Sequence, residues 1–386
     1  MKIALVHNKY SSYGGTERYI VNLTKGLLKR GHEVHIFASR FSLEPPLGAV
    51  THKVPLINLG RMGKDLSFAL FTFNVNRDNQ YDIVQGFSRI VRQDLIRSGG
   101  GVHKIYIRES LAPIKNNFLR GLKFARRTIS PAHWVSRYVE GLGYKKGNHR
   151  FVMAVSEKVK RDILNVYNVP PDSVRVIHNG VDLSVFHPDS LGGDRGTIRG
   201  RYRIGDGEIL LLFVATNFPL KGLEYLLKGM AKINRDDLKL LIVGGGNKRP
   251  FEAIVDNLKL KGRVIFAGKQ GDLLPFYHGA DILVHPTVYD PFANVCLEAM
   301  ASGLPVITSR INGFSDIVAD KENALLLNDP TDETEIAENI AYLLDKSKRL
   351  DMREKGIELS KQYTIDTHVD KVLSLYQEIV DLKRGE

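Results

Sequence analysis

Two carboxylates, Asp290 and Glu298, flank the predicted start of a helix in the segment HPTVYDPFANVCLEAMASGLPV. The predicted strand 282–285 ends in the loop that carries Asp290, and the helix begins near Asn294 with Glu298 one turn inside it. Backbone N–H groups near Asn294 and Val295 could bind phosphate oxygens, because a helix N-terminus favours anions, while the carboxylates accept hydrogen bonds from sugar hydroxyls. The same spacing is compatible with a capped helix that carries a surface glutamate.

Lys221 follows the predicted strand 209–214 after a short polar loop. A lysine at the carboxyl end of a strand can neutralise a diphosphate as a point charge, although an ordinary solvated lysine is the alternative. Gly14 and Gly15 stand between the first strand and the first helix, where a glycine lets the backbone approach a phosphate. The run 244–246 is a weaker hint of the same kind, because it lacks the dinucleotide-binding spacing.

His103 follows the glycine run 99–101, which suggests a loop beside a cleft, although a lone histidine is more often structural. The sequence contains no Asp-x-Asp pair and no His-x-x-x-His, so it offers no support for a divalent-metal site. A Gly-x-Ser-x-Gly nucleophile motif is also absent. The single cysteine, Cys296, lies inside a predicted helix and is interpreted as buried packing.

The elements that would position these residues alternate between strand and helix in two series. Such alternation predicts parallel sheets, so we expect the α/β class with two doubly wound, Rossmann-like domains. The boundary falls near a segment rich in glycine and charge, which gives domains 1–185 and 186–365 and a last amphipathic helix in 366–386. The expected strands are 3–6, 34–37, 83–84, 151–155, 174–177, 209–214, 238–243, 264–266, 282–285 and 305–307.

The charge of the chain is divided unevenly between its halves. The 386 residues carry a net charge of +12, but the first 180 hold 29 basic and 12 acidic residues and the remainder is net −5. The basic half favours an anionic partner. One cysteine excludes an intrachain disulfide, and the longest apolar run, 209–215, is far shorter than a membrane span. With no recognisable signal peptide at the start, we expect a cytoplasmic protein.

The order of these segments resembles the family-four retaining glycosyltransferases of the GT-B fold over nearly the whole chain. Residues 14–18 look like the N-terminal GG-x-E-R motif of that family, and 213–222 resemble its donor-phosphate loop ending in Lys-Gly. Asp290 to Glu298 would be its E-x7-E motif. Further similar segments are 154–156, 176–182, 280–281, 285–286 and 299–306.

The resemblance implies roles for individual residues. Asp290 would hold the transferred sugar, Glu298 the ribose hydroxyls, and Lys221 the diphosphate leaving group. His103 would contact the sugar near its anomeric region. The other residues implied in donor binding are Gly15, Thr216, Gly268, Lys269, Asn294 and Val295. The family's fold also implies an N-terminal acceptor domain and a C-terminal donor domain that face a cleft, with the last helix crossing back to pack on the first domain.

Three departures from the family pattern point to one branch. The first glutamate of the motif is Asp290, the usual Phe-Gly after it is replaced by residues 291–294, and an arginine five positions before Lys221 is replaced by Thr216. These variants look more like the branch that builds the lipopolysaccharide core, in particular its glucosyltransferase. We therefore expect metal-independent, retaining transfer of glucose from UDP-glucose to an anionic glycolipid or oligosaccharide, with no cofactor and no nucleic acid partner.

The basic half then predicts contact with the inner leaflet of the membrane. Five cations with aromatic and aliphatic residues between them form a candidate membrane or acceptor face: Lys115, Arg120, Lys123, Arg126 and Arg127. An ordinary solvated helix is the alternative. Other hypotheses are a hexosyltransferase that uses GDP-mannose or another nucleotide sugar, a sugar-nucleotide epimerase, a basic nucleic-acid-binding protein, and a catalytically weakened homologue that only binds the donor.

Overall fold

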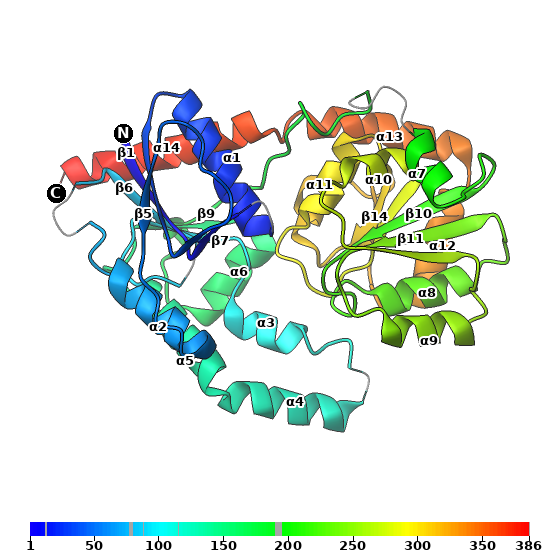
Figure 1. Ribbon diagram of the computed structural model, residues 1–386, viewed down its shortest axis with the longest axis horizontal. Helices are drawn as coiled ribbons and strands as arrows, with labels where there is room; N and C mark the ends of the chain where they lie inside the picture. Colours follow the sequence, from blue (N-terminus) through cyan, green and yellow to red (C-terminus); the bar gives the residue numbers. More distant parts are fainter. Residues whose placement is uncertain (12–13, 77–79, 88, 115, 190–194, 386) are drawn as a thin grey trace. The chain divides into compact units, whose positions relative to one another are not determined.

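The computed structural model describes the 386 residues apart from 12–13, 77–79, 88, 115, 190–194 and 386. Its contacts divide the chain into two compact units (Figure 1). The first unit combines Met1–Asn179 with Ile365–Glu386, and the second unit is Gly180–Thr364. The C-terminal helix therefore belongs to the first unit, although the whole second unit separates the two pieces in the sequence.

The first unit contains a parallel sheet of seven strands in the order β5-β3-β1-β6-β7-β8-β9. Alternate residues of β1 face two separate apolar clusters, Ile3 and Leu5 in one, Ala4 and Val6 in the other. Because side chains of a strand alternate between its two faces, both faces of this sheet are covered. The strands are β1 (Lys2–Val6), β3 (Glu33–Ala38), β5 (Ala49–Lys53), β6 (Ile83–Gly86), β7 (Leu95–Ser98), β8 (Phe151–Ala154) and β9 (Val174–Val176).

The C-terminal helix packs on the first helix of the same unit. A methyl group built on Gly26 would lie 2.6 Å from a methyl carbon of Val369, so the two helices meet closely there. The short strands β2 (Lys9–Tyr10) and β4 (Arg40–Phe41) pair separately. The helices of this unit are α1 (Gly15–Lys29), α2 (Gly60–Thr72), α3 (His103–Glu109), α4 (Asn117–Ile129), α5 (Pro131–Gly143), α6 (Glu157–Val166), the 3-10 helix η1 (Pro171–Ser173) and α14 (Ile365–Arg384).

The second unit contains a parallel sheet of six strands in the order β12-β11-β10-β13-β14-β15. Its central pair runs in register from Ile209 opposite Leu238 to Val214 opposite Val243. The strands are β10 (Ile209–Val214), β11 (Leu238–Val243), β12 (Val264–Gly268), β13 (Ile282–His285), β14 (Val306–Ser309) and β15 (Leu325–Leu327). The helices are α7 (Arg195–Arg201), α8 (Leu223–Ala231), α9 (Arg249–Asn257), α10 (Leu274–Gly279), α11 (Asn294–Ala301), η2 (Gly313–Ile317), α12 (Glu333–Tyr342) and α13 (Lys346–Ser360).

The predicted α/β class with two parallel, doubly wound sheets is confirmed. The predicted strands 209–214, 238–243 and 282–285 match β10, β11 and β13 to the residue. Five strands were not predicted: the two-residue strands β2 and β4, and β5, β7 and β15. Within the described part of the chain, no helix is both long enough and apolar enough to cross a membrane.

Candidate functional site

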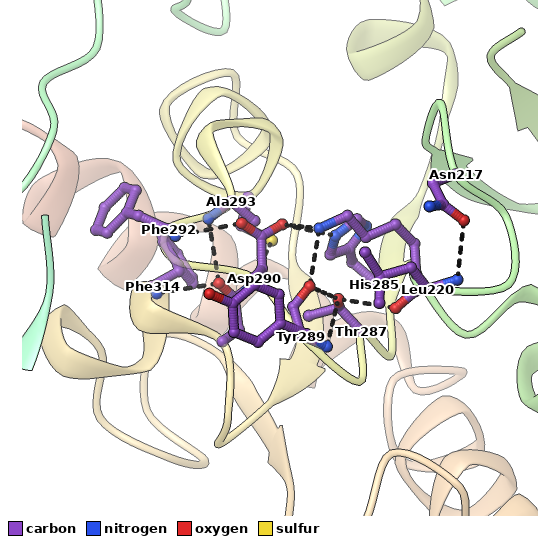
Figure 2. Close-up of polar contacts among 12 residues, drawn as sticks. Asn217, Leu220, His285, Thr287, Tyr289, Asp290, Phe292, Ala293 and Phe314 are labelled. Carbon is purple, nitrogen blue, oxygen red and sulfur yellow. Dashed lines mark hydrogen bonds and ion pairs between the residues drawn. The ribbon is translucent and has the colours of Figure 1, made fainter. Parts of the chain in front are cut away.

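Lys221 and Asp290 meet at the carboxyl ends of two neighbouring strands of the second unit. Lys221 lies in the loop after β10 and Asp290 in the loop after β13, and these strands are paired in parallel. The Lys221 Nζ donates to Asp290 Oδ2 at 2.5 Å and to the carbonyl oxygen of Tyr289 at 3.1 Å (Figure 2). The two side chains are only 18% and 13% exposed, so this is a largely buried ion pair.

The loops that carry this pair are tied together by backbone contacts. The carbonyl oxygen of Leu220 accepts hydrogen bonds from the Val288 N–H at 3.1 Å and from the Thr287 hydroxyl at 3.2 Å. Gly222 has a φ of +78°, and a Cβ built on it would lie 2.0 Å from the carbonyl oxygen of Pro286. Only glycine permits this conformation and this approach together, so Gly222 fixes the position of the lysine before it.

The surroundings of Asp290 keep its carboxylate charged. Burial alone would raise the pKa, but the Lys221 charge and the neighbouring His285 lower it, and the net pKa is well below its usual range. The Phe292 N–H also donates to Asp290 Oδ1 at 3.2 Å. His285 Nε2 lies 3.7 Å from Oδ2, and burial lowers the pKa of His285, which favours a neutral ring at pH 7.

Asn312 organises the start of α11 and was not anticipated from the sequence. Its side chain is fully buried, and its Oδ1 accepts from the backbone N–H groups of Ala293 and Phe314, both at 3.1 Å (Figure 2). Its Nδ2 donates to the Thr308 hydroxyl at 3.0 Å. The signal in the sequence is slight, because an asparagine before a glycine after a strand is typical of any turn.

Glu298 lies on α11, which begins at Asn294 as predicted. The glutamate is 5% exposed, and its Oε2 accepts a hydrogen bond from the Tyr277 hydroxyl at 3.0 Å. The helix N-cap is Ala293, whose side chain cannot accept a hydrogen bond. Asn294 and Val295, in the first turn, are partly exposed. The predicted carboxylate pair thus brackets a helix N-terminus, as the sequence suggested.

The remaining predicted donor-binding residues of the second unit lie at the same edge of its sheet. Thr216 is exposed in the loop after β10, and Gly268 is the exposed last residue of β12, with a φ of +70°. A Cβ built on Gly245, after β11, would lie 3.7 Å from the Cβ of the exposed Lys269. Because β12, β11, β10 and β13 are consecutive in the sheet, these residues and the ion pair share one edge, which is where open α/β sheets bind ligands.

The other predicted residues belong to the first unit. Gly15 is the exposed first residue of α1, while Ser12 and Tyr13 of the predicted glycine turn lie outside the described residues. His103 is the first residue of α3 and lines a cavity of about 510 Å³ together with Gly99, Gly100 and Gly101. The glycine run therefore does border a hollow.

Both ring nitrogens of His103 are hydrogen bonded within the protein. Arg89 Nη2 lies 3.2 Å from His103 Nδ1, and His103 Nε2 lies 3.0 Å from His133 Nδ1. A guanidinium can only donate, so Nδ1 must be the acceptor and a neutral His103 carries its proton on Nε2. A sugar hydroxyl could bond to this ring only by replacing Arg89 or His133. The Glu140 carboxylate fixes the backbone, because it accepts from the His103 N–H at 2.9 Å.

Four of the five predicted membrane-face cations lie on α4: Arg120, Lys123, Arg126 and Arg127. Lys115 lies outside the described residues. Arg127 is partly exposed and donates to the Ser110 hydroxyl at 2.6 Å. In the described ranges of the chain, no group of three or more His, Cys, Asp or Glu side chains could hold a metal ion.

Two family models match the chain, one for each unit. The Glycosyltransferase Family 4 model matches residues 13–185, and the model described as glycosyl transferases group 1 matches residues 194–359. Together they leave little of the chain unmatched.

Similar proteins of known sequence carry glycosyltransferase names. The lipopolysaccharide glucosyltransferase WaaG of Escherichia coli is 23% identical over 350 residues, which cover 90% of each chain. The glycosyltransferase MJ1607 of Methanocaldococcus jannaschii is 28% identical over 84% of each chain. The D-inositol 3-phosphate glycosyltransferase of Corynebacterium glutamicum is 27% identical over 95% of this chain and 92% of its own.

Solved structures agree in fold. The crystal structure of WaaG, described as a glycosyltransferase involved in lipopolysaccharide biosynthesis, superposes with a TM-score of 0.81 at 20% identity and covers 97% of this chain and 99% of its own. The Anabaena protein HepE in complex with UDP-glucose superposes with a TM-score of 0.73 at 16% identity, over 97% and 99% of the two chains. The chain therefore carries a Glycosyltransferase Family 4 domain followed by a glycosyl transferases group 1 domain, and it is a glycosyltransferase of the GT-B fold.

Proposed function

We propose that this glycosyltransferase moves glucose from UDP-glucose to a hydroxyl of an anionic glycolipid acceptor such as the lipopolysaccharide inner core, with retention and without a metal ion. The Lys221–Asp290 pair beside the start of α11 carries the proposal, because it places a cation next to a carboxylate that can bind a sugar. The similarity to WaaG and to HepE in complex with UDP-glucose supports this donor and this class of acceptor.

The pair would act by exchanging partners when the donor binds. The Lys221 ammonium group would then contact the diphosphate as well as Asp290, and the N–H groups of the first turn of α11 would donate to the same diphosphate. The carboxylate oxygen released in this way would accept a hydrogen bond from a sugar hydroxyl. Asp290 would remain oriented throughout, because the Phe292 N–H holds its other oxygen.

The reaction would take place on one face of the sugar. The bond from the anomeric carbon to the diphosphate breaks, and the bond to the acceptor oxygen forms on the same side. The departing diphosphate oxygen takes the proton of the acceptor hydroxyl, so no strong protein base is required. Stabilisation of charge on the leaving group would be the main contribution of the protein.

A thermal-shift screen against UDP, GDP, ADP and UDP-glucose, with and without EDTA, tests the donor. We expect a selective rise in melting temperature with UDP and UDP-glucose that EDTA does not change, because a ligand bound only to the native state stabilises it. A selective rise with GDP or ADP would contradict the proposed donor. A rise that EDTA abolishes would contradict the metal-independent mechanism.

Variants at the pair test the proposed roles. Lys221→Ala should reduce glucosyl transfer on the order of 10²-fold or more, as removal of a preorganised charge stabiliser does in other enzymes. Asp290→Asn should also reduce transfer, because it removes the charge that binds the sugar. Lys228→Ala is the matched control, since Lys228 pairs with Glu224 on α8 of the same unit. Unchanged transfer in Asp290→Asn would contradict the sugar-binding role.

We also propose that α4 attaches the enzyme to an anionic membrane surface. None of the described residues of this helix is buried, and Phe118, Leu122 and Ile129, which share one side of the helix, are 79%, 58% and 78% exposed. An amphipathic helix normally buries such a stripe against its own protein, and a basic helix that leaves it uncovered is typical of membrane-surface segments.

Flotation with vesicles that contain anionic lipid tests this attachment. Replacing Arg120, Lys123 and Arg126 with Gln should reduce the fraction of protein that floats with the vesicles. Each basic side chain near an anionic surface contributes roughly 1 kcal/mol to the binding free energy when the salt concentration is low. Three exposed lysines of the second unit provide the control variant: Lys232, Lys248 and Lys261. Equal flotation of the two triple variants would contradict a specific role for α4.

A further inference from the structure

The cavity in the first unit contains a buried arginine that neither the predicted site nor the proposed mechanism uses. The cavity, of about 510 Å³, is bordered by residues that follow β1 and β6, by the end of β7, and by the glycine loop before α3. This is the carboxyl edge of the first sheet, where open parallel sheets bind ligands. Arg97 is the third of the four residues of β7, and it lines this cavity.

Arg97 is only 6% exposed, yet no carboxylate contacts it in the part of the chain that the structure describes. Its Nη2 donates to the side-chain oxygen of Asn179 at 2.7 Å, and the guanidinium lies 3.5 Å from the centre of the Tyr19 ring. Its Nε is buried without a hydrogen-bond partner among the described residues. Burial lowers the pKa of Arg97, as expected for a cation removed from water without a counter-ion.

The groups beside Arg97 cannot supply the missing negative charge. His368 Nδ1 donates to the carbonyl oxygen of His178 at 2.7 Å, so its Nε2 is free to accept from the Tyr19 hydroxyl at 2.8 Å. Burial raises the pKa of Tyr19 to about 12 and lowers the pKa of His368 to about 4. Both side chains are neutral at pH 7, and the cluster keeps one positive charge.

The carboxylates in the cavity wall are directed at residues other than Arg97. Asp65 and Glu140 lie 3.5 and 3.7 Å from nitrogens of Arg89. Glu17 lies 4.0 Å from His7. Arg97 is therefore the buried cation of this wall that lacks an acidic partner among the described residues.

We propose that Arg97 binds a phosphate monoester group of the acceptor in this cavity. The assignment of that phosphate to the acceptor rests on the proposed function. The planar guanidinium presents paired donors that match two phosphate oxygens. The glycine loop leaves space for the guanidinium, because a Cβ built on Gly99 would lie 1.9 Å from Arg97 Nη1. The space beside Gly100 is open, since a Cβ built there would meet nothing within 4 Å. A bound phosphate would supply the counter-ion that Arg97 lacks among the described residues.

Calorimetric titration of the full-length protein with inorganic phosphate, at constant ionic strength, tests the site. We expect Arg97→Gln to weaken phosphate binding by about tenfold or more, since the hydrogen bonds to a charged group are lost. Lys248→Ala, at an exposed lysine of the second unit outside both proposed sites, should leave it unchanged. Equal affinity in folded Arg97→Gln and in wild type would overturn the proposal, as would loss of binding in Lys221→Ala alone, which would place the phosphate in the second unit.

Two conservative variants keep the test decisive if Arg97→Gln does not fold, as judged by circular dichroism. Gly99→Ala retains the charge but displaces Nη1, and Arg97→Lys retains the charge but removes the paired donors. Both should weaken phosphate binding. Unchanged affinity in both folded variants would overturn the proposal. Acetate is the chemical control, and binding of acetate as tightly as phosphate would overturn the preference for a phosphate ester.

Competition identifies the source of the phosphate. Displacement of bound phosphate by glucose 6-phosphate would support a soluble sugar phosphate, and displacement by vesicles containing phosphatidic acid would support a lipid headgroup. If neither competes, the acceptor assignment is overturned. The UDP-glucose thermal shift separates the two proposals. Phosphate binding at Arg97 without that shift would support this site and contradict the proposed donor. A shift with UDP-glucose without phosphate binding at Arg97 would support the donor and contradict this site.

Discussion

Removal of both partners of the Lys221–Asp290 pair should cost no more stability than removal of either partner alone. The side chains are 18% and 13% exposed and meet at 2.5 Å. Breaking a buried pair by deleting one partner costs about 3–5 kcal/mol, because the other charge stays buried without a counter-ion. Replacing both partners is often nearly neutral. We expect Lys221→Met and Asp290→Asn each to cost about 3 kcal/mol, and the double variant to cost no more than either, a coupling of about 3 kcal/mol.

Replacing Lys221 should reverse the direction in which the Asp290 carboxyl makes the free energy of unfolding depend on pH. In the wild type the folded-state pKa of Asp290 is lowered, so its contribution is present above its unfolded pKa of 3.8 and is lost as the pH falls through the folded value. In Lys221→Met the raising effect of burial is no longer opposed by the lysine. The native state then takes up a proton at Asp290 or at the adjacent His285, and this variant should regain stability relative to wild type between pH 7 and pH 5.

Hydrogen exchange of the full-length chain, followed by mass spectrometry of peptides that cover β13 and α11, measures the opening free energy at the site. The less buried Lys228–Glu224 pair, 24% and 32% exposed, provides the control, and Lys228→Met should cost no more than about 0.5 kcal/mol. Additive single variants, with a coupling below about 0.5 kcal/mol, would refute the buried-pair argument. A pH 5 to pH 7 difference that is the same in wild type and Lys221→Met would refute the protonation argument.

Three further outcomes follow from the geometry. Gly222→Ala should lower the free energy of unfolding in urea by at least about 2 kcal/mol more than Gly262→Ala does. Both glycines have a φ of +78°, but only a Cβ on Gly222 would meet a backbone atom. Equal losses in the two variants would contradict the close approach. Cys296 is fully buried and burial raises its pKa, so iodoacetamide at pH 8 should leave it unmodified in the native chain and react once urea unfolds it; native-state alkylation would contradict its packing. Tyr277→Phe should lower the free energy of unfolding by about 1–2 kcal/mol, because it removes the hydroxyl that donates to the buried Glu298, and unchanged stability would show that this bond contributes little.

Three strands of the second unit could be predicted closely because they are buried on both faces. β10, β11 and β13 consist mainly of large apolar residues, with Lys239 in β11 and His285 at the end of β13 as the exceptions, and such apolar runs are the pattern of strands inside a parallel sheet. β7 was missed because half of its four residues, Arg97 and Ser98, are polar, although all four are buried. β5 was missed because it is an edge strand that is mostly exposed. The hydrophobic pattern therefore failed at β7, where polar groups are buried, and at β5, which is exposed, whereas β15 was missed although it consists of three buried leucines.

The candidate site could be predicted only as separate residues. Lys221 and Asp290 each follow a strand, but their contact depends on β10 lying next to β13, and two other strands come between them in the sequence. Strand order is a property of long-range packing, which local periodicity does not contain. Asn312 and Arg97 were missed for a related reason. Each derives its importance from what it faces after folding, and neither residue type is unusual at its position in the sequence.

The short carboxylate at position 290 has a structural explanation. The resemblance leads one to expect a glutamate there, and the aspartate kept open the hypothesis of a weakened homologue. Asp290 Oδ1 accepts from the backbone N–H two residues ahead, at Phe292, while Oδ2 contacts Lys221. An aspartate closes this turn readily, and Pro291 restricts the backbone inside it. A glutamate, one methylene longer, would not close the same ring. The changes at 290 and 291 therefore act together to hold a charged carboxylate beside Lys221, a geometry that fits the proposed donor site better than a degenerate one.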